Sequence, residues 1–311
     1  MAGPNQAGLC MDAVVLDGVT KRFDSLTAVA GLNLRIRQGS FFGLLGPNGA
    51  GKTTTLRMIL RILLPDEGSI QILGQPLGET TQDRLGYLPE ERGLYPRMTV
   101  QAVLVFLGAL KGLDEAEAGR RAAGWLERLE IGDWGPRKVN ELSKGMQQKV
   151  QFIAAILHEP PVLVLDEPFM GLDPVNAGVV KDIMLELRDH GATIVLSTHR
   201  MEQVEMMCDS ICLIDRGRQV LSGDLREIKR AYGRNTVRIE YAAGRDSFDL
   251  DRFAASVNRF GSTVEAKLRP DVEPGEILKA IVEQGVSIVR FELIEPPLAD
   301  IFIEKVTGNH A

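Results

Sequence analysis

The sequence predicts an α/β fold, in which helices cover a parallel β-sheet, followed by a smaller α+β domain. A glycine-rich loop at residues 46–54 lies between an apolar strand-like run and a helix-like run. The four consecutive apolar residues 162–165 are typical of a strand buried on both faces, and residues 193–196 are expected to form a second buried strand. Helical patterns alternate with these strands, which favours a parallel sheet. From residue 233 onward, strand-like alternation returns without any nucleotide motif, which predicts a separate small domain.

The N-terminal part is expected to contribute short strands before and after the glycine-rich loop. Residues 1–11 lack the basic and apolar parts of a signal peptide, and we expect them to form a disordered lead-in. Gly31 is expected to mark a turn. Alternating or apolar runs predict strands at 14–19, 32–36, 69–73 and 84–88.

A helical insertion is expected at about residues 90–160. Apolar residues recur at three- and four-residue steps between 99 and 129, which indicates helix. A further helix at 145–159 is expected to end at Pro160-Pro161. Beyond it, the patterns predict a helix at 176–189, a hairpin around Asp215-Arg216-Gly217, tail strands at 236–241, 263–268 and 287–293, and tail helices at 276–284 and 298–306.

Composition excludes several functional classes. The net charge is −6, the pI is about 5.4 and aromatic residues make up only 5% of the chain, so nucleic acid is not expected as a partner. No apolar run approaches the ~18 residues that a membrane span needs, so any transport function requires separate membrane subunits. The three cysteines are too few for a disulfide framework and are expected to be structural thiols.

The glycine-rich loop has the sequence of a phosphate-binding P-loop. Its glycines allow a tight turn that brings backbone N–H groups to a polyphosphate, and the following helix directs its positive end at the same group. Lys52 is expected to reach the β- and γ-phosphates, and Thr53 to ligate magnesium. A purely structural glycine turn is the alternative, which the flanking strand and helix make weaker. The predicted phosphate-binding residues are Gly46, Pro47, Asn48, Gly49, Ala50, Gly51, Lys52, Thr53 and Thr54.

Four further segments resemble the motifs of ABC-type ATPases, in the order of that family. Residues 142–148, Leu-Ser-Lys-Gly-Met-Gln-Gln, resemble its signature motif, and 162–168 its Walker B strand. Gly171-Leu172-Asp173 is similar to the D-loop, and Ser197-Thr198-His199 to the switch histidine. The resemblance covers about residues 14–222. It implies a P-loop NTPase core with a parallel sheet, an antiparallel β part and a helical subdomain, in an ATPase domain at 12–232 before an accessory domain at 233–311.

The resemblance also implies a role for each motif residue, with ATP and Mg²⁺ as cofactors. Asp166 ends a buried strand, where it would hold magnesium with Thr53, and Glu167 would be the general base. His199 would bond the γ-phosphate, and Lys52 would act beside it in catalysis. Ser143 and Gly145 would serve the ATP of a second subunit, either an identical copy or another ATPase. The alternatives are an ordinary N-cap at Ser143 and an acidic pair at 166–167 that merely caps a helix or is solvated.

Several residues depart from the family pattern. Glu90 stands where the family has a glutamine that touches magnesium and water, so we expect it to contact the nucleotide and the metal. Lys144 and Met146 replace a usual glycine and glutamine, and Gln147 is expected to replace that glutamine in part. Phe23 would stack on adenine, as the family's aromatic does, or else be a core residue.

The tail and the segment after Glu90 narrow the resemblance. Residues 90–96 and 297–303 are similar to a bacterial export-type subgroup that includes the sodium-extruding, Nat-type ATPases and has a C-terminal accessory domain. The chain would then be an ATPase subunit on the cytoplasmic face of the membrane that powers a multi-span permease. We expect docking through residues 90–140, with Tyr95 and Phe106 on that face. The alternatives are a remodelling module without solute transport and, less favoured because the chain has one P-loop, a ribosome or DNA ATPase.

Overall fold

The computed structural model describes residues 11–91, 93–232, 236–242 and 248–308. The chain divides into two compact units, Met1–Ser222 and Gly223–Ala311. The division falls before helix α8 (Leu225–Ala231), whereas the sequence suggested a boundary after residue 232. Of the expected lead-in, only Met11 lies within the described residues, and its side chain is exposed.

A small antiparallel sheet opens the first unit, with strand order β2-β1-β4-β5. Strands β1 and β2 are longer than the sequence suggested, because register shifts interrupt their alternation without ending the pairing. The prediction of a turn at Gly31 was wrong: this glycine lies inside β2 with a φ of +60°, beside one of these shifts. The strands are β1 (Asp12–Phe23), β2 (Leu26–Arg37), β4 (Glu67–Ile72) and β5 (Gln75–Pro76).

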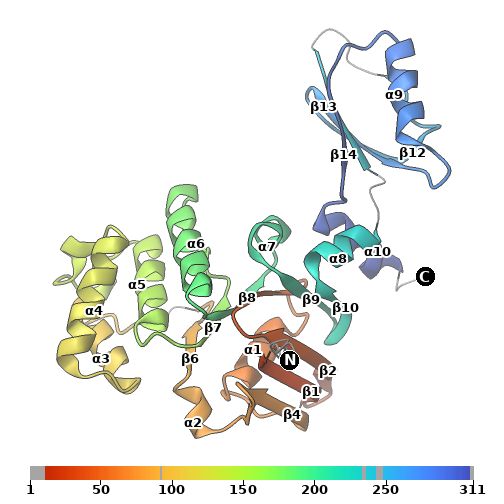
Figure 1. Ribbon diagram of the computed structural model, residues 1–311. Coiled ribbons are helices and arrows are strands. Elements are labelled where there is room, and N and C mark those ends of the chain that lie inside the picture. Colours follow the sequence, from red (N-terminus) through yellow and green to blue (C-terminus); the bar gives the residue numbers. More distant parts are fainter. Residues whose placement is uncertain (1–10, 92, 233–235, 243–247, 309–311) are drawn as a thin grey trace, which may run out of the picture. The chain divides into compact units, whose positions relative to one another are not determined.

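The second sheet of this unit has six strands in the order β10-β9-β3-β8-β7-β6, and its pairs from β9 to β6 are parallel (Figure 1). The prediction of a parallel sheet is therefore confirmed. Every residue of β3, β7 and β8 is buried, as expected for strands covered on both faces. The strands are β3 (Phe41–Leu45), β6 (Leu85–Leu88), β7 (Val162–Asp166), β8 (Thr193–Thr198), β9 (Ser210–Asp215) and β10 (Arg218–Asp224).

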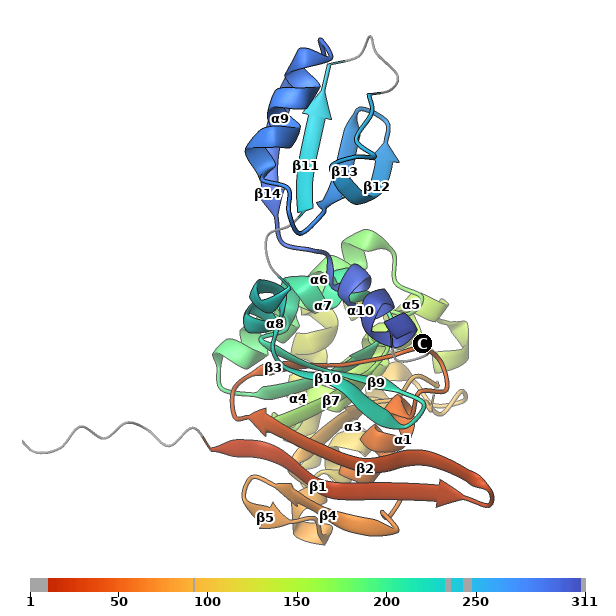
Figure 2. The ribbon, with the colours of Figure 1, turned by 90° about the vertical axis from the view of Figure 1, so that its right-hand side faces the viewer.

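Helices cover both faces of the six-stranded sheet. Helix α1 (Lys52–Ile59) lies between the two sheets, where Leu56 and Met58 share one apolar core with residues of both (Figure 2). Helices α5 (Lys144–Ile156), α6 (Pro174–Asp189) and α7 (Met201–Met207) lie over the other face. Burial on both faces holds the strand ends, and the loops that follow them, in fixed positions.

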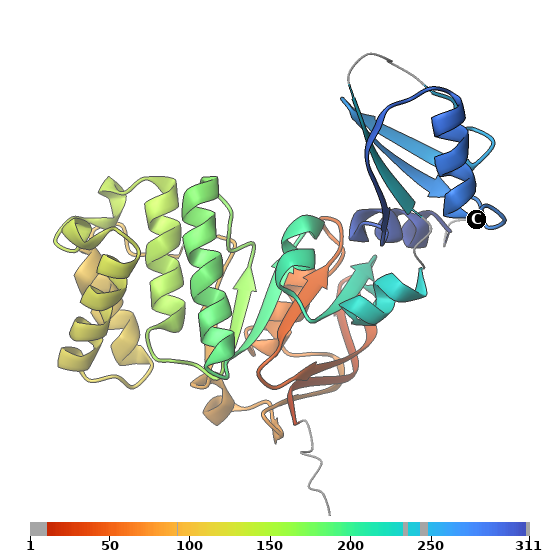
Figure 3. The same ribbon diagram turned by 45° about the horizontal axis from the view of Figure 1, so that its top comes forward.

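The helical insertion forms one end of the first unit (Figure 3). It comprises α3 (Val100–Leu110), α4 (Glu115–Arg128), two single-turn helices and the start of α5. The N-caps Thr99, Asp114 and Ser143 each accept a hydrogen bond from a backbone N–H of the first turn, which fixes where these helices begin. A short helix, α2 (Glu79–Gln82), precedes the insertion.

The second unit contains a four-stranded antiparallel sheet with the order β12-β13-β11-β14. Apolar residues on one sheet face and on α9 (Pro274–Glu283) form its core. Strand β12 (Ala254–Phe260) was not predicted, because it is an edge strand with a mostly exposed, weakly alternating sequence. The other elements are β11 (Thr236–Tyr241), β13 (Thr263–Leu268), β14 (Ile288–Ile294) and α10 (Leu298–Gly308).

No described helix in either unit is both long and apolar enough to cross a membrane.

Candidate functional site

The P-loop connects β3 to α1 through backbone conformations that require glycine. Gly46, Gly49 and Gly51 have φ values of +151°, +78° and +107°, in the region that L side chains rarely adopt. A Cβ at Gly46 would lie 2.1 Å from the carbonyl oxygen of Ile214, and one at Gly51 would lie 2.5 Å from that of Ala28. The loop is thus pressed against its neighbours and can present its backbone N–H groups at the start of α1.

Lys52 is the buried cation of this loop. Its Nζ donates to the carbonyl oxygens of Gly46 at 2.8 Å and Pro47 at 3.0 Å. Burial lowers the pKa of Lys52, and the nearby carboxylates of Glu167, Asp166 and then Glu90 oppose that shift. An anion with several negative charges would satisfy this ammonium group better than two carbonyl groups do.

A second pair joins the P-loop to the end of β7. Thr53 donates its hydroxyl to Asp166 Oδ2 at 3.0 Å, and Asp166 is only 1% exposed. Burial raises the pKa of Asp166. Among the described residues, no group of three His, Cys, Asp or Glu side chains could hold a metal ion. The pair instead fits Mg²⁺, which takes one or two protein oxygens and completes its shell with water and phosphate.

Glu167 is held rigidly beside this pair. Its Oε2 accepts a hydrogen bond from Thr198 Oγ1 at 3.1 Å, and its Oε1 accepts from the backbone N–H of His199 at 3.0 Å and from His199 Nδ1 at 2.6 Å. Because a carboxylate can only accept, the ring must carry its proton on Nδ1. Glu167 also has a φ of +48°, a strained conformation that the surrounding structure maintains.

These groups face one cleft of about 780 Å³. The sequence-predicted residues that line it are Phe23, Asn48, Gly49, Gly51, Lys52, Thr53, Thr54, Glu90, Asp166, Glu167 and His199. Gly46, Pro47 and Ala50 belong to the same loop without lining the cleft. Phe23 is 42% exposed, so the core alternative for this residue is wrong. Its ring lies 5.6 Å from the ammonium group of Lys21.

Sequence reasoning missed six residues that line the cleft. Three lie on β2, and Met170 lies in the loop after the Walker B strand. Arg216 and Gly217 lie at the tip of the β9–β10 hairpin, which the sequence predicted as a hairpin but did not connect to the site. No local motif identifies the residues on β2 and the hairpin, because contacts between segments that are far apart in the sequence bring them to the P-loop. The residues on β2 are Leu26, Thr27 and Ala28.

The signature residues lie apart from this cleft. Ser143 is exposed and accepts a hydrogen bond from Met146 N at 3.2 Å, so the N-cap reading is confirmed. Neither Ser143 nor Gly145 lines the cleft. Gln147 donates from Nε2 to the carbonyl oxygens of Val139 and Leu142 at 3.3 and 3.2 Å, so its amide stabilises its own loop.

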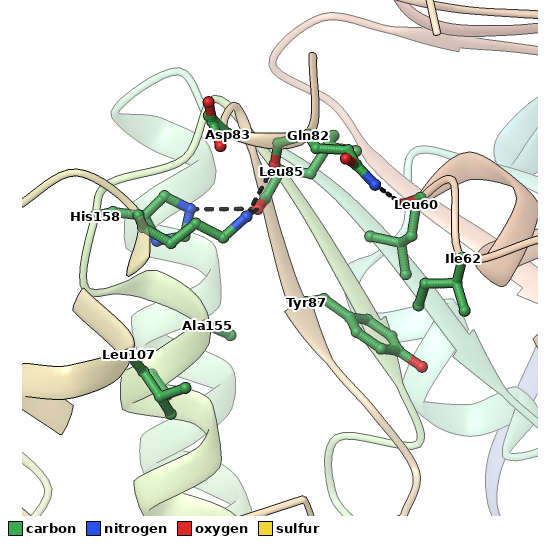
Figure 4. A pocket seen from close by; sticks show the side chains of 11 residues that line it. Leu60, Ile62, Gln82, Asp83, Leu85, Tyr87, Leu107, Ala155 and His158 are labelled. Atoms are coloured by element: carbon green, nitrogen blue, oxygen red, sulfur yellow. Dashed lines mark hydrogen bonds between the residues drawn. The ribbon is translucent and has the colours of Figure 1, made fainter. Parts of the chain in front are cut away.

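A second hollow, of about 440 Å³, lies between the insertion and the core (Figure 4). In Figure 4, Ile62 and Tyr87 lie on one side of it, and Leu107 and His158 on the other. Its polar groups largely bond to the chain itself: Lys111 Nζ donates to the carbonyl oxygens of Gln82 at 2.9 Å and Leu85 at 3.1 Å, and His158 Nε2 to that of Leu85 at 3.2 Å. Burial lowers the pKa of His158 to about 4, so its ring is neutral at pH 7. The groove therefore presents mainly apolar walls.

Comparison with known proteins agrees with this geometry. The family model of ABC transporters matches residues 29–170, and that of the C-terminal domain of DrrA1-3-like ATP-binding proteins matches residues 223–306. The uncharacterized ABC transporter ATP-binding protein YhaQ of Bacillus subtilis (strain 168) is 46% identical over 94% of this chain and 98% of its own. The daunorubicin resistance ATP-binding protein DrrA3 of Streptomyces coeruleorubidus is 32% identical over 96% of each chain.

A solved structure shows the same fold. The ATP-binding cassette MJ0796, a dimer in a post-hydrolysis state bound to ADP and Pi, matches with a TM-score of 0.63 and 26% identity. The match covers 68% of this chain and 99% of that one. With a P-loop, a buried acidic strand end and a switch histidine around one cleft, and with relatives that match over nearly their whole length, this chain belongs to the ATP-binding subunits of ABC transporters.

Proposed function

We propose that this protein binds and hydrolyses ATP with Mg²⁺ and thereby powers a separate membrane permease that exports its substrate. The observation that carries the proposal is the convergence of three elements on one cleft: Lys52, the Thr53–Asp166 pair and the Glu167–His199 pair. Phosphoryl transfer needs a cation for the phosphates, oxygens for the metal and a group that orients water. The cleft supplies all three.

Each residue has a distinct task in this proposal. Lys52 and the N–H groups of the P-loop bind the phosphates, and Thr53 and Asp166 hold Mg²⁺, which neutralises phosphate charge. Glu90 lines the cleft and contacts the metal or its water. Glu167 accepts the proton of the attacking water, and the donors from Thr198 and His199 fix its orientation. Phe23 supports the adenine by stacking.

His199 has a conditional role. With its Nδ1 proton donated to Glu167, the neutral ring presents only a lone pair on Nε2. The ring can keep its bond to Glu167 and also donate from Nε2 to the γ-phosphate only when both of its nitrogens are protonated. His199 therefore bonds the γ-phosphate as an imidazolium, or releases Glu167 when the nucleotide arrives.

Two chains form the working unit. Ser143 and Gly145 lie outside their own cleft, and the family's subunits dimerise and work with membrane permeases. We infer that these residues contact the γ-phosphate bound to the P-loop of the second subunit, an identical copy or a related ATPase. The unit would then act on the cytoplasmic face of the membrane.

The name of one relative bears on the transported substrate. DrrA3 carries daunorubicin resistance in its name and shares the C-terminal domain type. We therefore favour export of an organic compound over the sodium export suggested by the Nat-type resemblance. A remodelling role without solute movement is the alternative, and transport assays with the permease separate the two.

The groove of Figure 4 is our candidate for the permease contact. It has mainly apolar walls and is built from both the core and the insertion, so an element inserted there would respond to movement between them. Leu107 and Lys111 come from the expected docking segment 90–140. Tyr95 and Phe106 do not line the groove; they form an exposed edge-to-face pair with ring centroids 5.6 Å apart.

Replacing Lys52 by Met tests the nucleotide site. The change removes the charge and keeps the apolar stem, so we expect the affinity for Mg-ATP to fall about 100-fold, because charge-assisted bonds to phosphate are lost. Calorimetric titration measures it. Lys181→Met, on α6 outside the cleft, is the control and should bind as the unaltered protein does. Equal affinity in both variants would contradict the proposal.

Replacing Leu107 by Glu tests the groove. A buried charge should prevent docking, so we expect reconstituted transport to fall about tenfold or more, while ATP hydrolysis by the isolated subunit stays within about twofold. Leu110→Glu is the matched control, since Leu110 is exposed on the same helix and lies outside the groove. If both variants transport equally well, the permease docks elsewhere.

A further inference from the structure

The turn of the β9–β10 hairpin has a backbone conformation that is unfavourable for one of its two residues. Its two loop residues, Arg216 and Gly217, have φ values of +48° and +75°, as in a type I′ turn. The first position of such a turn is usually Asn, Asp or Gly, because other side chains are strained there. Arg216 is therefore a poor choice for the fold. Glu167, which lines the same cleft, also has a positive φ, of +48°.

The hairpin tip is fixed between the P-loop and β2. The N–H of Gly217 donates to the carbonyl oxygen of Ala50 at 2.9 Å, and its carbonyl oxygen accepts from the N–H of Ala30 at 2.8 Å. A Cβ on Gly217 would lie 2.7 Å from the carbonyl oxygen of Ala28, so glycine is required there. The backbone that carries Arg216 is thus held beside the strand that lines the cleft.

The charge of the cleft favours a second cation. Its described lining carries three carboxylates, from Glu90, Asp166 and Glu167, against the basic groups of Lys52 and Arg216. These three carboxylates lie close enough to Lys52 to raise its pKa, against the lowering effect of burial. Arg216 is exposed and, within the described part of the chain, makes no hydrogen bond or ion pair. An unpaired guanidinium at a polyphosphate site is available for the ligand.

We propose that Arg216 is a nucleotide-binding residue whose guanidinium bonds the α-phosphate and ribose of ATP. This rests on the proposed nucleotide site. The metal and γ-phosphate end lies with Lys52 and Asp166, whereas Arg216 follows β9 to a tip beside residues 27–28 of β2. The strand continues from there toward Leu26 and the aromatic ring of Phe23. Arg216 thus stands where the middle of the nucleotide would pass.

Arg216→Asn separates binding from folding, because asparagine suits the turn. We expect the variant to bind Mg-ATP and Mg-ADP about tenfold more weakly, by the same factor for both, since both carry the α-phosphate. Without nucleotide, its Tm should rise by about 1–3 °C, because the strained arginine is gone. Titration calorimetry measures the affinities, and calorimetric melting measures the Tm. Arg216→Lys keeps the charge and should bind with intermediate affinity.

Arg218→Asn is the matched control, as it removes the same charge from the same hairpin outside the cleft. It should bind ATP within about twofold of the unaltered protein. If both variants lose the same affinity for ATP, the cause is long-range charge and the proposal is overturned. Unchanged affinity in Arg216→Asn would also overturn it. A loss for ATP alone would overturn the α-phosphate assignment, and a lowered Tm would indicate a structural residue. If Lys52→Met binds ATP weakly and Arg216→Asn binds it normally, the proposed nucleotide site is supported and only the role of Arg216 is contradicted.

Discussion

Replacing Glu167 by Gln is expected to lower ATP turnover by a factor of about 10² to 10⁴ while ATP binding persists. The glutamine keeps the size of the side chain and cannot take the proton of the attacking water. The local network can accommodate it: the amide oxygen can accept from the N–H and ring of His199, and the amide nitrogen can donate to Thr198, whose hydroxyl can turn to accept. The variant should therefore fold normally.

Phosphate release under saturating Mg-ATP measures that turnover, and calorimetric titration measures the binding. Glu202→Gln on α7 makes the same chemical change at an exposed position outside the cleft and should hydrolyse ATP normally. Turnover in Glu167→Gln that matches this control would remove Glu167 from the role of base. Loss of binding together with turnover would show instead that Glu167 supports the site structurally.

The sequence pattern predicted the bounds of strands best where one face of the strand is buried. Strands β11 and β13 begin and end at the predicted residues, because their side chains alternate between core and surface. β12 was missed for the opposite reason: only Ala254 is buried along it, and its register shifts after that residue. In β1 and β2, register shifts and the positive φ of Gly18 and Gly31 produce local breaks that resemble turns.

The candidate site was predictable to the extent that it is local. Three segments can each be recognised from a few consecutive residues: the P-loop, the end of β7 and the end of β8. Parallel pairing of β3, β8 and β7 places these segments at the same end of the sheet. Met170 follows Glu167 by three residues, so it too belongs to the local part of the site, although it was overlooked. Arg216 and residues 26–28 come to the cleft only through the packing of the hairpin and β2 against the P-loop. No pattern inside those segments records that contact, so only the structure reveals it.

In the proposed mechanism, the remaining chemistry depends on the association of two subunits. The P-loop lines the cleft and Ser143 does not, so the two halves that we propose for an ATP site lie apart within one chain. Gly145 packs closely on the D-loop, where an added Cβ would lie 3.1 Å from the carbonyl oxygen of Gly171. The signature residues are thus held in place before a partner arrives, which lowers the entropy cost of forming the interface. A two-fold dimer that pairs each P-loop with the other chain's signature would complete both sites at once.

Replacing Ser143 by Arg should abolish that dimer. In the Glu167→Gln background with ATP, we expect sedimentation to show a dimer, and the added Ser143→Arg change to leave monomers that still bind ATP, because the large side chain would fill the space for the partner's phosphate. In otherwise unaltered protein, Ser143→Arg should lower turnover by about 100-fold or more. Loss of the N-cap costs only about 1 kcal/mol, so the fold should survive. Ser143→Thr keeps the hydroxyl and the cap and should dimerise. A dimer that persists in Ser143→Arg would place Ser143 outside the interface, and the ATP sites would then have to be completed within one chain.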